Sequence, residues 1–338
     1  MKKERNSRAS KIALILCAVL VLGIIGADFF MNLQKCEKTY TAMGTVVTAK
    51  ISGKSSAEAE EEIRMTVSGI ETSCLSWRVS DSDVSRINAS CGDFASVSSD
   101  TANWISDCCE ISEQSGHAFD ITVGKVTKLW NFDGESNTVP DKKDIESALE
   151  YVDCSRLFFN ETGVKEAKGQ FIDMGAVGKG IACDCARKIA ENYGVKSAIV
   201  SVGGSVLIYG GKASVGIINP WDDAKYIGTI KMKNQCVSTS GDYERFFEKD
   251  GKTYHHIIDP ATGYPVENDL RSVTVICDSG LKSDALSTAC FVMGYKSSLG
   301  LLNRYDAEAV YVFKDKTVAV TDGLKDNFRL TDSGFKMK

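Results

Sequence analysis

Residues 237–266 read VSTSGDYERFFEKDGKTYHHIIDPATGYPV, and residues 283–289 read SDALSTA. Polar and ionisable side chains are dense in the first stretch, where two of the chain's three histidines, His255 and His256, are adjacent. Glycines and prolines interrupt this stretch, which predicts turns rather than long elements. Polar side chains on turns that are held by strands and helices are a common way to build a site. An ordinary surface meander between strands is the alternative interpretation.

The composition is that of an ordinary globular protein. The chain has 338 residues, of which 43% are hydrophobic and 25% are charged, and its formal net charge is -5. This length suits one large domain or two smaller ones. No basic tract follows the first eleven residues, so the sequence excludes a nucleic-acid-binding protein. An anionic ligand would have to be held by local amides, a lysine or a metal.

The N-terminus predicts a membrane anchor. Residues 1–11 contain five basic side chains, and residues 12–27 are continuously apolar or small. This pattern predicts an uncleaved signal anchor over residues 1–31, with the N-terminus inside and the following domain extracytoplasmic at the cell membrane. A lipoprotein attached at Cys36 is less favoured, because Lys35 is unsuitable before a lipidated cysteine.

The twelve cysteines do not form a recognisable disulfide framework. One lies in the apolar N-terminal segment, and the remaining eleven are an odd number. The Cys108-Cys109 and Cys183-x-Cys185 spacings are not typical of disulfide scaffolds or zinc sites. We therefore expect most of these cysteines to be small apolar core residues with free thiols.

Patterns of apolar residues and turn signals predict an α+β fold. Ser55 with Glu58 suggests a capping box that opens a helix ending near Ile70. Further helices are expected over 100–115, 141–151, from the turn after 173 to Gly194, and 283–293. Strands are expected over 40–51, 171–173, 197–202, 206–209, 271–277, 310–313 and 317–320.

Residues 173–180 (DMGAVGKG) suit the approach of a pyrophosphate. Their glycines allow a ligand close to the backbone, and the following helix directs free amides and a positive dipole end at it. Lys179 adds a positive charge. The stretch is neither a Walker A motif nor a full GxGxxG motif, so a tight turn with helix packing remains an alternative.

Asp284 and Thr288 are four residues apart on a predicted helix and therefore share a face. A carboxylate and a hydroxyl are oxygen ligands that suit Mg²⁺ bridging phosphates. The alternative is that Asp284 favours the helix N-terminus and Thr288 packs in the interior.

Residues 254–263 (YHHIIDPATG) combine a strand with a turn. Alternation predicts His256 and Ile258 on one strand face and His255 and Ile257 on the other. A histidine here suits a general base, since its unperturbed pKa is about 6.5; a structural histidine is the alternative. Residues 116–124 (GHAFDITVG) offer Asp120 and Thr122 at the end of a helix.

These motifs together resemble the ApbE family, the FAD:protein FMN transferases, formerly assigned to thiamine biosynthesis as lipoproteins. The resemblance covers about residues 38–325, and the last three segments named next are the most specific. The matching segments are 43–45, 75–76 with 81–88, 118–120 with 122–124, 129–130, 172–180 with Asp184, 203–204, 238–245, 256–263 and 284–289.

The resemblance implies a fold and a reaction. It implies one large ApbE-like, T-fold-related domain over 38–325 with mixed or antiparallel sheets and flanking helices, followed by a tail at 326–338. It implies a Mg²⁺-dependent reaction in which FMN is transferred from FAD to a Ser or Thr hydroxyl of an acceptor protein. The FMN phosphate forms the new bond, and AMP is released. The implied acceptors are Rnf- or Nqr-type redox subunits or other extracytoplasmic flavin carriers.

The resemblance also implies site residues. Asp284, Thr288 and a backbone carbonyl near Ala176 would hold the metal, and we hypothesise His256 as the general base and Asp284 as the main metal ligand. The residues implied in FAD binding are Met43, Trp77, Ala118, Phe119, Asp120, Lys179, Asp184, Ser240, His256 and Ile257.

The chain departs from the family pattern at His117 (usually Gly), Ile121 (usually Pro) and Arg78 (usually aromatic), where Trp77 is adjacent. These departures concern flavin contacts rather than the class of reaction. Two other functions stay open: hydrolysis of FAD to FMN and AMP, and non-enzymatic FAD binding at the membrane. The second needs neither a metal nor a base.

Overall fold

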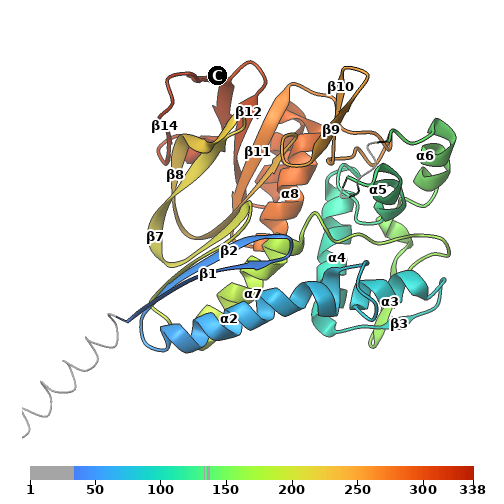
Figure 1. Ribbon diagram of the computed structural model, residues 1–338, viewed down its shortest axis with the longest axis horizontal. Helices are drawn as coiled ribbons and strands as arrows, with labels where there is room; N and C mark the ends of the chain where they lie inside the picture. The colour runs from blue at the N-terminus through green and yellow to red at the C-terminus, as the bar shows by residue number, and fades with distance from the viewer. Residues whose placement is uncertain (1–33, 133, 135–137) are drawn as a thin grey trace, which may run out of the picture.

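The computed structural model describes residues 34–132, 134 and 138–338. A ten-stranded sheet is at the centre of this fold (Figure 1). Neighbouring strands are antiparallel, except that β13 (Thr317–Val320) and β15 (Lys336–Met337) are parallel, so the sheet is mixed as predicted. The strand order before these two is β1 (Lys35–Ala42), β2 (Thr45–Ser52), β6 (Ser197–Val202), β7 (Ser205–Asn219), β8 (Asp222–Gly241), β11 (Leu270–Cys277) and β12 (Glu308–Phe313), and β14 (Phe328–Leu330) pairs with β8.

Three helices, α2 (Ser56–Ile70), α7 (Gly178–Asn192) and α8 (Gly280–Met293), pack against this sheet and against one another. Ile63 of α2 and Ala186 of α7 share a core cluster with Val47 and Val200 of the sheet. Helix α8 packs on β8 and β11, and its first turns meet the first turns of α7 (Figure 1). Burial of these apolar faces therefore places the N-termini of α7 and α8 next to each other.

The remaining elements form the part of the molecule drawn at the right of Figure 1. Trp130 joins two of them, because its ring contacts Phe247 and Tyr254 of the two-stranded hairpin. The elements are η1 (Glu71–Leu75), α3 (Asp83–Ala89), α4 (Ser99–Gln114), α5 (Gly124–Trp130), α6 (Lys142–Leu149), η2 (Cys154–Arg156), the sheet β3 (Ala95–Ser96), β5 (Gly163–Lys165) and β4 (Phe158–Asn160), and the hairpin β9 (Phe246–Lys249) and β10 (Lys252–His255); α9 (Tyr295–Arg304) and η3 (Asp322–Leu324) complete the fold.

The α+β prediction is confirmed, and several of its details are wrong. The single strand expected over 40–51 is a hairpin, because Met43 and Gly44 both adopt positive φ (52° and 67°) and reverse the chain. Phe171 makes only an isolated bridge to Val123, so 171–173 is not a strand. Helix α2 begins beside Ser55 as expected, but Ser55 has positive φ and its side chain makes no capping hydrogen bond.

Some elements had no clear sequence signal. Strand β8 spans 20 residues and carries charged side chains, since much of it lies exposed in a long hairpin with β7. Helix α8 begins at Gly280, three residues before the predicted start, because Ser279 caps it. Residues 326–338, set apart above as a tail, contribute β14 and β15 to the main sheet.

The eleven cysteines that the structure describes are all free, and six of them are buried. Burial raises the pKa of the Cys236 and Cys277 thiols to about 12, which keeps them protonated. No helix among the described residues is long and apolar enough to span a membrane. The anchor predicted over 1–31 lies outside the described residues.

Candidate active site

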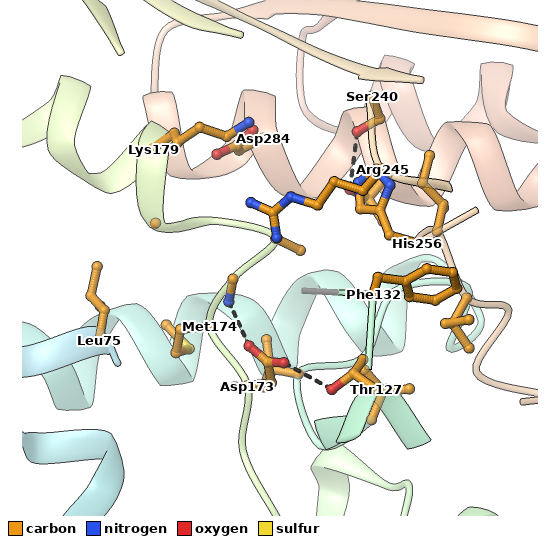
Figure 2. A pocket seen from close by; sticks show the side chains of 18 of the residues that line it. Leu75, Thr127, Phe132, Asp173, Met174, Lys179, Ser240, Arg245, His256 and Asp284 are labelled. Atoms are coloured by element: carbon orange, nitrogen blue, oxygen red, sulfur yellow. Dashed lines mark hydrogen bonds between the residues drawn. The ribbon is translucent and has the colours of Figure 1, made fainter. Parts of the chain in front are cut away.

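A cavity of about 770 Å³ lies between the N-terminal ends of α7 and α8 and the elements around α5. This volume is in the range of small-molecule sites. Its walls come from segments far apart in the sequence, as Figure 2 shows for Leu75, Thr127, Lys179, His256 and Asp284. The predicted site residues that line it are Met43, Trp77, Ala118, Phe119, Asp120, Ala176, Lys179, Ser240, His256, Ile257, Asp284 and Thr288.

The turn before α7 forms one wall of this cavity. Asp173 shapes the turn: its Oδ1 accepts a hydrogen bond from the Gly175 backbone N–H at 2.9 Å, and its Oδ2 accepts one from Thr127 Oγ1 at 2.9 Å (Figure 2). Gly175 and Ala176 remain exposed. Helix α7 then starts at Gly178 and directs its N-terminus at the cavity, a geometry that suits an anionic group.

Lys179 and Arg245 bring positive charge to the same end of the cavity (Figure 2). The Lys179 Nζ lies 3.9 Å from Glu244 Oε2, and its side chain is about one quarter exposed. At such a distance the pair is loose, so the ammonium keeps hydrogen-bonding capacity for a ligand.

Asp284 is buried at the first turns of α8 and still lines the cavity. Its Oδ2 accepts a hydrogen bond from the Gly180 N–H at 2.8 Å, and its Oδ1 accepts one from Ser205 Oγ at 3.2 Å. Each carboxylate oxygen therefore retains acceptor capacity. Burial raises the pKa of Asp284, and nearby Lys179 opposes that rise. A cation bound at this carboxylate would offset the cost of burying its charge.

Thr288 lies one turn further along α8 and lines the same cavity. Its Oγ1 is 3.1 Å from Ser240 Oγ, which is itself 2.7 Å from Ser287 Oγ. The expectation that Asp284 and Thr288 share one helix face is confirmed, and that face lines the cavity.

These oxygens fit a magnesium ion. Asp284 and Thr288 present a carboxylate and a hydroxyl, and Ala176, in the exposed turn before α7, lines the same cavity. Within residues 34–132, 134 and 138–338, no group of three or more His, Cys, Asp or Glu side chains is arranged to hold a metal. A single carboxylate beside a hydroxyl suits Mg²⁺, which commonly binds one or two carboxylates and takes its other ligands from water and substrate phosphates.

The two adjacent histidines lie in different environments. His256 lines the cavity, and its buried Nδ1 has no hydrogen-bond partner among the described residues. His255 is buried, its Nε2 donates to the Val266 carbonyl at 2.9 Å, and its Nδ1 accepts from the Ile257 N–H at 3.3 Å. It lines a second cavity of about 670 Å³. The alternation prediction is wrong beyond β10, because His256, Ile257 and Ile258 all line the first cavity.

Burial shifts the pKa of both histidines downward. It lowers the pKa of His256 to about 3, with Arg245, His255 and Lys179 adding to the effect, and it lowers the pKa of His255 to about 4. Both imidazoles are therefore neutral near pH 7.

Asp120 contributes to the cavity mainly by shaping the loop around it. Its Oδ1 accepts hydrogen bonds from the Thr122 N–H and hydroxyl at 2.8 and 2.6 Å. Its Oδ2 accepts from the Cys154 N–H at 3.0 Å and from Ser112 Oγ at 3.1 Å. This carboxylate is satisfied by the protein, so the loop's backbone and Phe119 are left to contact a ligand.

Trp77 offers an aromatic surface to the cavity. Its ring contacts Phe171 edge-on at 5.4 Å, and the Arg78 guanidinium lies 4.0 Å from its centroid. The Trp77 Nε1 is buried without a hydrogen-bond partner among the described residues. A flat ligand with a hydrogen-bond acceptor would satisfy this indole.

Asp184 is placed elsewhere. It lies outside the cavity lining, and its carboxylate accepts hydrogen bonds from Gly280 N–H, Leu281 N–H and Ser279 Oγ. The expected contact with a flavin nucleotide is therefore replaced by a contact with the start of α8.

Sequence reasoning assigned no site role to several residues that line the cavity, among them Arg245, Asp173, Thr127, Lys128 and Phe132. Asp173 and Arg245 lie inside the motifs at 173–180 and 237–266, so their positions in the sequence could have indicated a role in the site. Thr127, Lys128 and Phe132 had no such signal, because only the packing of α5 brings them to the cavity.

A helix N-terminus, Lys179 and the oxygen pair of Asp284 and Thr288 line one cavity, and this combination suits a phosphate-containing ligand. The ApbE family model matches residues 43–312, and the chain belongs to the ApbE family. It is 30% identical to a FAD:protein FMN transferase of Treponema pallidum over 97% of this chain and 98% of that protein. A second protein of that name, from Klebsiella pneumoniae, is 35% identical over 65% of this chain and 71% of its own length.

Solved structures agree with this family. The ApbE protein of Thermotoga maritima superposes with a TM-score of 0.81 at 33% identity, covering 88% of this chain and 100% of that one. The apo form of the Pseudomonas stutzeri flavinyl transferase ApbE gives a TM-score of 0.77 at 28% identity, covering 87% of this chain and 96% of its own.

Proposed function

We propose that this chain is a Mg²⁺-dependent FAD:protein FMN transferase that forms a phosphoester between FMN and a Ser or Thr hydroxyl of an acceptor protein. The observation that carries the proposal is the meeting of Asp284, Thr288 and the N-terminus of α7 at one end of a cavity of about 770 Å³. Membership of the ApbE family supports it, because relatives across the full chain have the name FAD:protein FMN transferase.

The chain's residues would hold the FAD diphosphate at this end. The first amides of α7 and the side chains of Lys179 and Arg245 neutralise its charge. Asp284, Thr288 and the Ala176 carbonyl would hold Mg²⁺, which supplies charge neutralisation at the phosphates when it is bound. The flavin and adenine would lie along Met43, Trp77, Phe119 and Ile257.

His256 suits the role of base. The acceptor hydroxyl oxygen would form a bond to the FMN phosphorus, the bond from that phosphorus to the AMP oxygen would break, and the hydroxyl proton would pass to His256. His256 is neutral in the free protein because burial and the positive charge of Arg245 lower its pKa to about 3. A bound diphosphate would offset that positive charge and raise the pKa of His256 toward the range of an effective base.

The acceptor and the location are part of the proposal. The basic residues before an apolar segment support an N-terminal membrane anchor with an extracytoplasmic catalytic domain. Acceptors on that side of the membrane would be flavin-carrying redox subunits of the Rnf or Nqr type, as the family resemblance implies.

The test uses the full chain, purified in detergent and stripped of metal. It is mixed with FAD, Mg²⁺ and the Ser/Thr-containing domain of a Rnf-type subunit. Flavin fluorescence on the acceptor band of a denaturing gel, with an equal amount of AMP, is the expected result. AMP without labelled acceptor would favour FAD hydrolysis, and FAD binding with neither product would favour a binding protein.

A further inference from the structure

Near their starts, helices α7 and α8 each have a glycine four residues before an aspartate: Gly180 and Asp184 in α7, and Gly280 and Asp284 in α8. Residues four apart share a helix face, so each helix presents a glycine and an aspartate to the other. The contacts are reciprocal: the Gly180 N–H donates to Asp284 Oδ2 at 2.8 Å, and the Gly280 N–H donates to Asp184 Oδ1 at 2.6 Å.

The two helix starts touch through their backbones at this crossing. A Cβ added at Gly180 would lie 2.1 Å from the Gly280 carbonyl oxygen, and one added at Gly280 would lie 2.1 Å from the Gly180 carbonyl oxygen. No side chain fits between these atoms, so glycine at both positions lets the hydrogen bonds form.

The two aspartates differ in their remaining contacts. Asp184 also accepts hydrogen bonds from Leu281 N–H and Ser279 Oγ, both at 2.9 Å, and it does not line the cavity. Ser279 Oγ in turn accepts from the Lys282 N–H at 3.3 Å. Asp184 and Ser279 together satisfy the first three free N–H groups of α8.

We propose that Asp184 is a positioning residue for the metal site. By binding the first turn of α8, it holds Asp284 and Thr288 at a set position relative to the N-terminus of α7, where the diphosphate would lie. The inference rests on the proposed function, because it concerns the same magnesium site. Loss of such a supporting contact typically costs about 10- to 100-fold in metal affinity or activity.

Asp184→Asn is the informative variant, because it keeps the side-chain shape and removes the charge and one acceptor. Asp83→Asn is a matched control: Asp83 Oδ2 accepts hydrogen bonds from Ser98 N–H, Ser98 Oγ and Thr101 Oγ1 at the start of α4, away from the cavity lining. Both variants remove a carboxylate that accepts hydrogen bonds at the start of a helix, and only the first touches the helix that contains Asp284.

We expect Asp184→Asn to raise the Mg²⁺ concentration for half-maximal transfer about tenfold. The rise in Tm that Mg²⁺ alone produces in the full chain should shift to higher Mg²⁺ by the same factor. FAD affinity measured without Mg²⁺ should be unchanged. Asp83→Asn should lower the Tm and leave the Mg²⁺ requirement at the wild-type value.

An unchanged Mg²⁺ requirement in Asp184→Asn, or an equal change in both variants, would overturn the inference while leaving wild-type transfer intact. Absence of transfer by the wild-type chain would instead count against the proposed function. If Asp184→Asn does not fold, Ser279→Ala removes one of its partners, and a smaller rise in the Mg²⁺ requirement, about threefold, is expected. An unchanged requirement in Ser279→Ala would then overturn the inference.

Discussion

The residues that line the cavity and their neighbours outside it include the same residue types, but their hydrogen bonding differs. His256 and Asp284 line the cavity, whereas His255 and Asp184 lie outside it. His255 has both ring nitrogens in hydrogen bonds, and the Asp184 carboxylate accepts three. His256 Nδ1 has no partner among the described residues, and Asp284 has acceptor capacity to spare.

This contrast separates groups that are available for chemistry from groups that hold the structure. A satisfied buried polar group stabilises one conformation, while an unsatisfied one costs free energy unless a ligand binds to it. His255 and Asp184, outside the cavity, therefore help to hold the cavity-lining residues in position. Replacing cavity-lining residues should change the rate of FMN transfer. Replacing their neighbours outside the cavity should change protein stability or the Mg²⁺ requirement.

The largest effect should follow Asp284→Asn. This variant keeps an acceptor for the Gly180 N–H but removes the charge that would balance a cation. We expect the rate of FMN transfer at saturating FAD to fall on the order of 1000-fold. AMP release and acceptor labelling over a range of Mg²⁺ concentrations measure this. Wild-type rates at high Mg²⁺ would contradict the assignment of Asp284 as the main metal ligand.

His256→Gln should have the next largest effect, a loss of about 100-fold in kcat, because a positioned base contributes at least that much. His255→Gln is its matched control. Glutamine at 255 can still donate to the Val266 carbonyl, so its transfer rate should stay near that of the wild-type protein. Single-turnover labelling of the acceptor compares the two variants, and equal losses would remove the distinction between the two histidines.

The pH dependence of the free energy of unfolding should reveal how His255 contributes to stability. Its pKa is about 4 in the folded protein and about 6.5 when unfolded, so below pH 6.5 the unfolded state binds more protons. The stability contributed by neutral His255 is present above pH 6.5 and is lost as the pH falls toward 4. The free energy of unfolding should therefore decrease on acidification, by up to about 1.4 kcal/mol per pH unit for each such proton.

His255→Gln should make this dependence shallower without abolishing it, because the pKa of His256 is lowered in the same direction. Urea unfolding of the FAD-free protein between about pH 4.5 and 7.5 measures the slope. An unchanged slope in the variant would show that His255 is protonated to the same extent in the folded and unfolded states.

The smallest effect should come from Trp77→Leu, which keeps an apolar wall and removes the aromatic surface and the Nε1 donor. We expect FAD affinity to fall about fivefold, with kcat at saturating FAD unchanged. Quenching of FAD fluorescence on titration measures the affinity. A lower kcat with unchanged affinity would place Trp77 near the reacting phosphate instead.

Much of the site was predictable because its motifs are local. The spacing of Asp284 and Thr288 placed both on one helix face, and the glycines around Lys179 indicated a turn before a helix. The family resemblance assigned Asp184 to the ligand, but its side chain binds α8. No pattern within α7 could indicate this, since its partner lies about one hundred residues away.

The sequence by itself indicated several of the turns, though not the one at Met43 and Gly44, and it indicated which residues share a helix face, because glycine, proline and apolar periodicity act over a few residues. It also contained enough ordered motifs to identify the family. Only the tertiary structure decided which histidine and which aspartate of each pair remain available to a ligand. That choice depends on partners outside each motif, such as the Val266 carbonyl for His255 and the Gly280 amide for Asp184. The turn over 259–264 returns the chain so that Val266 meets His255, and the packing of α7 against α8 brings Gly280 to Asp184.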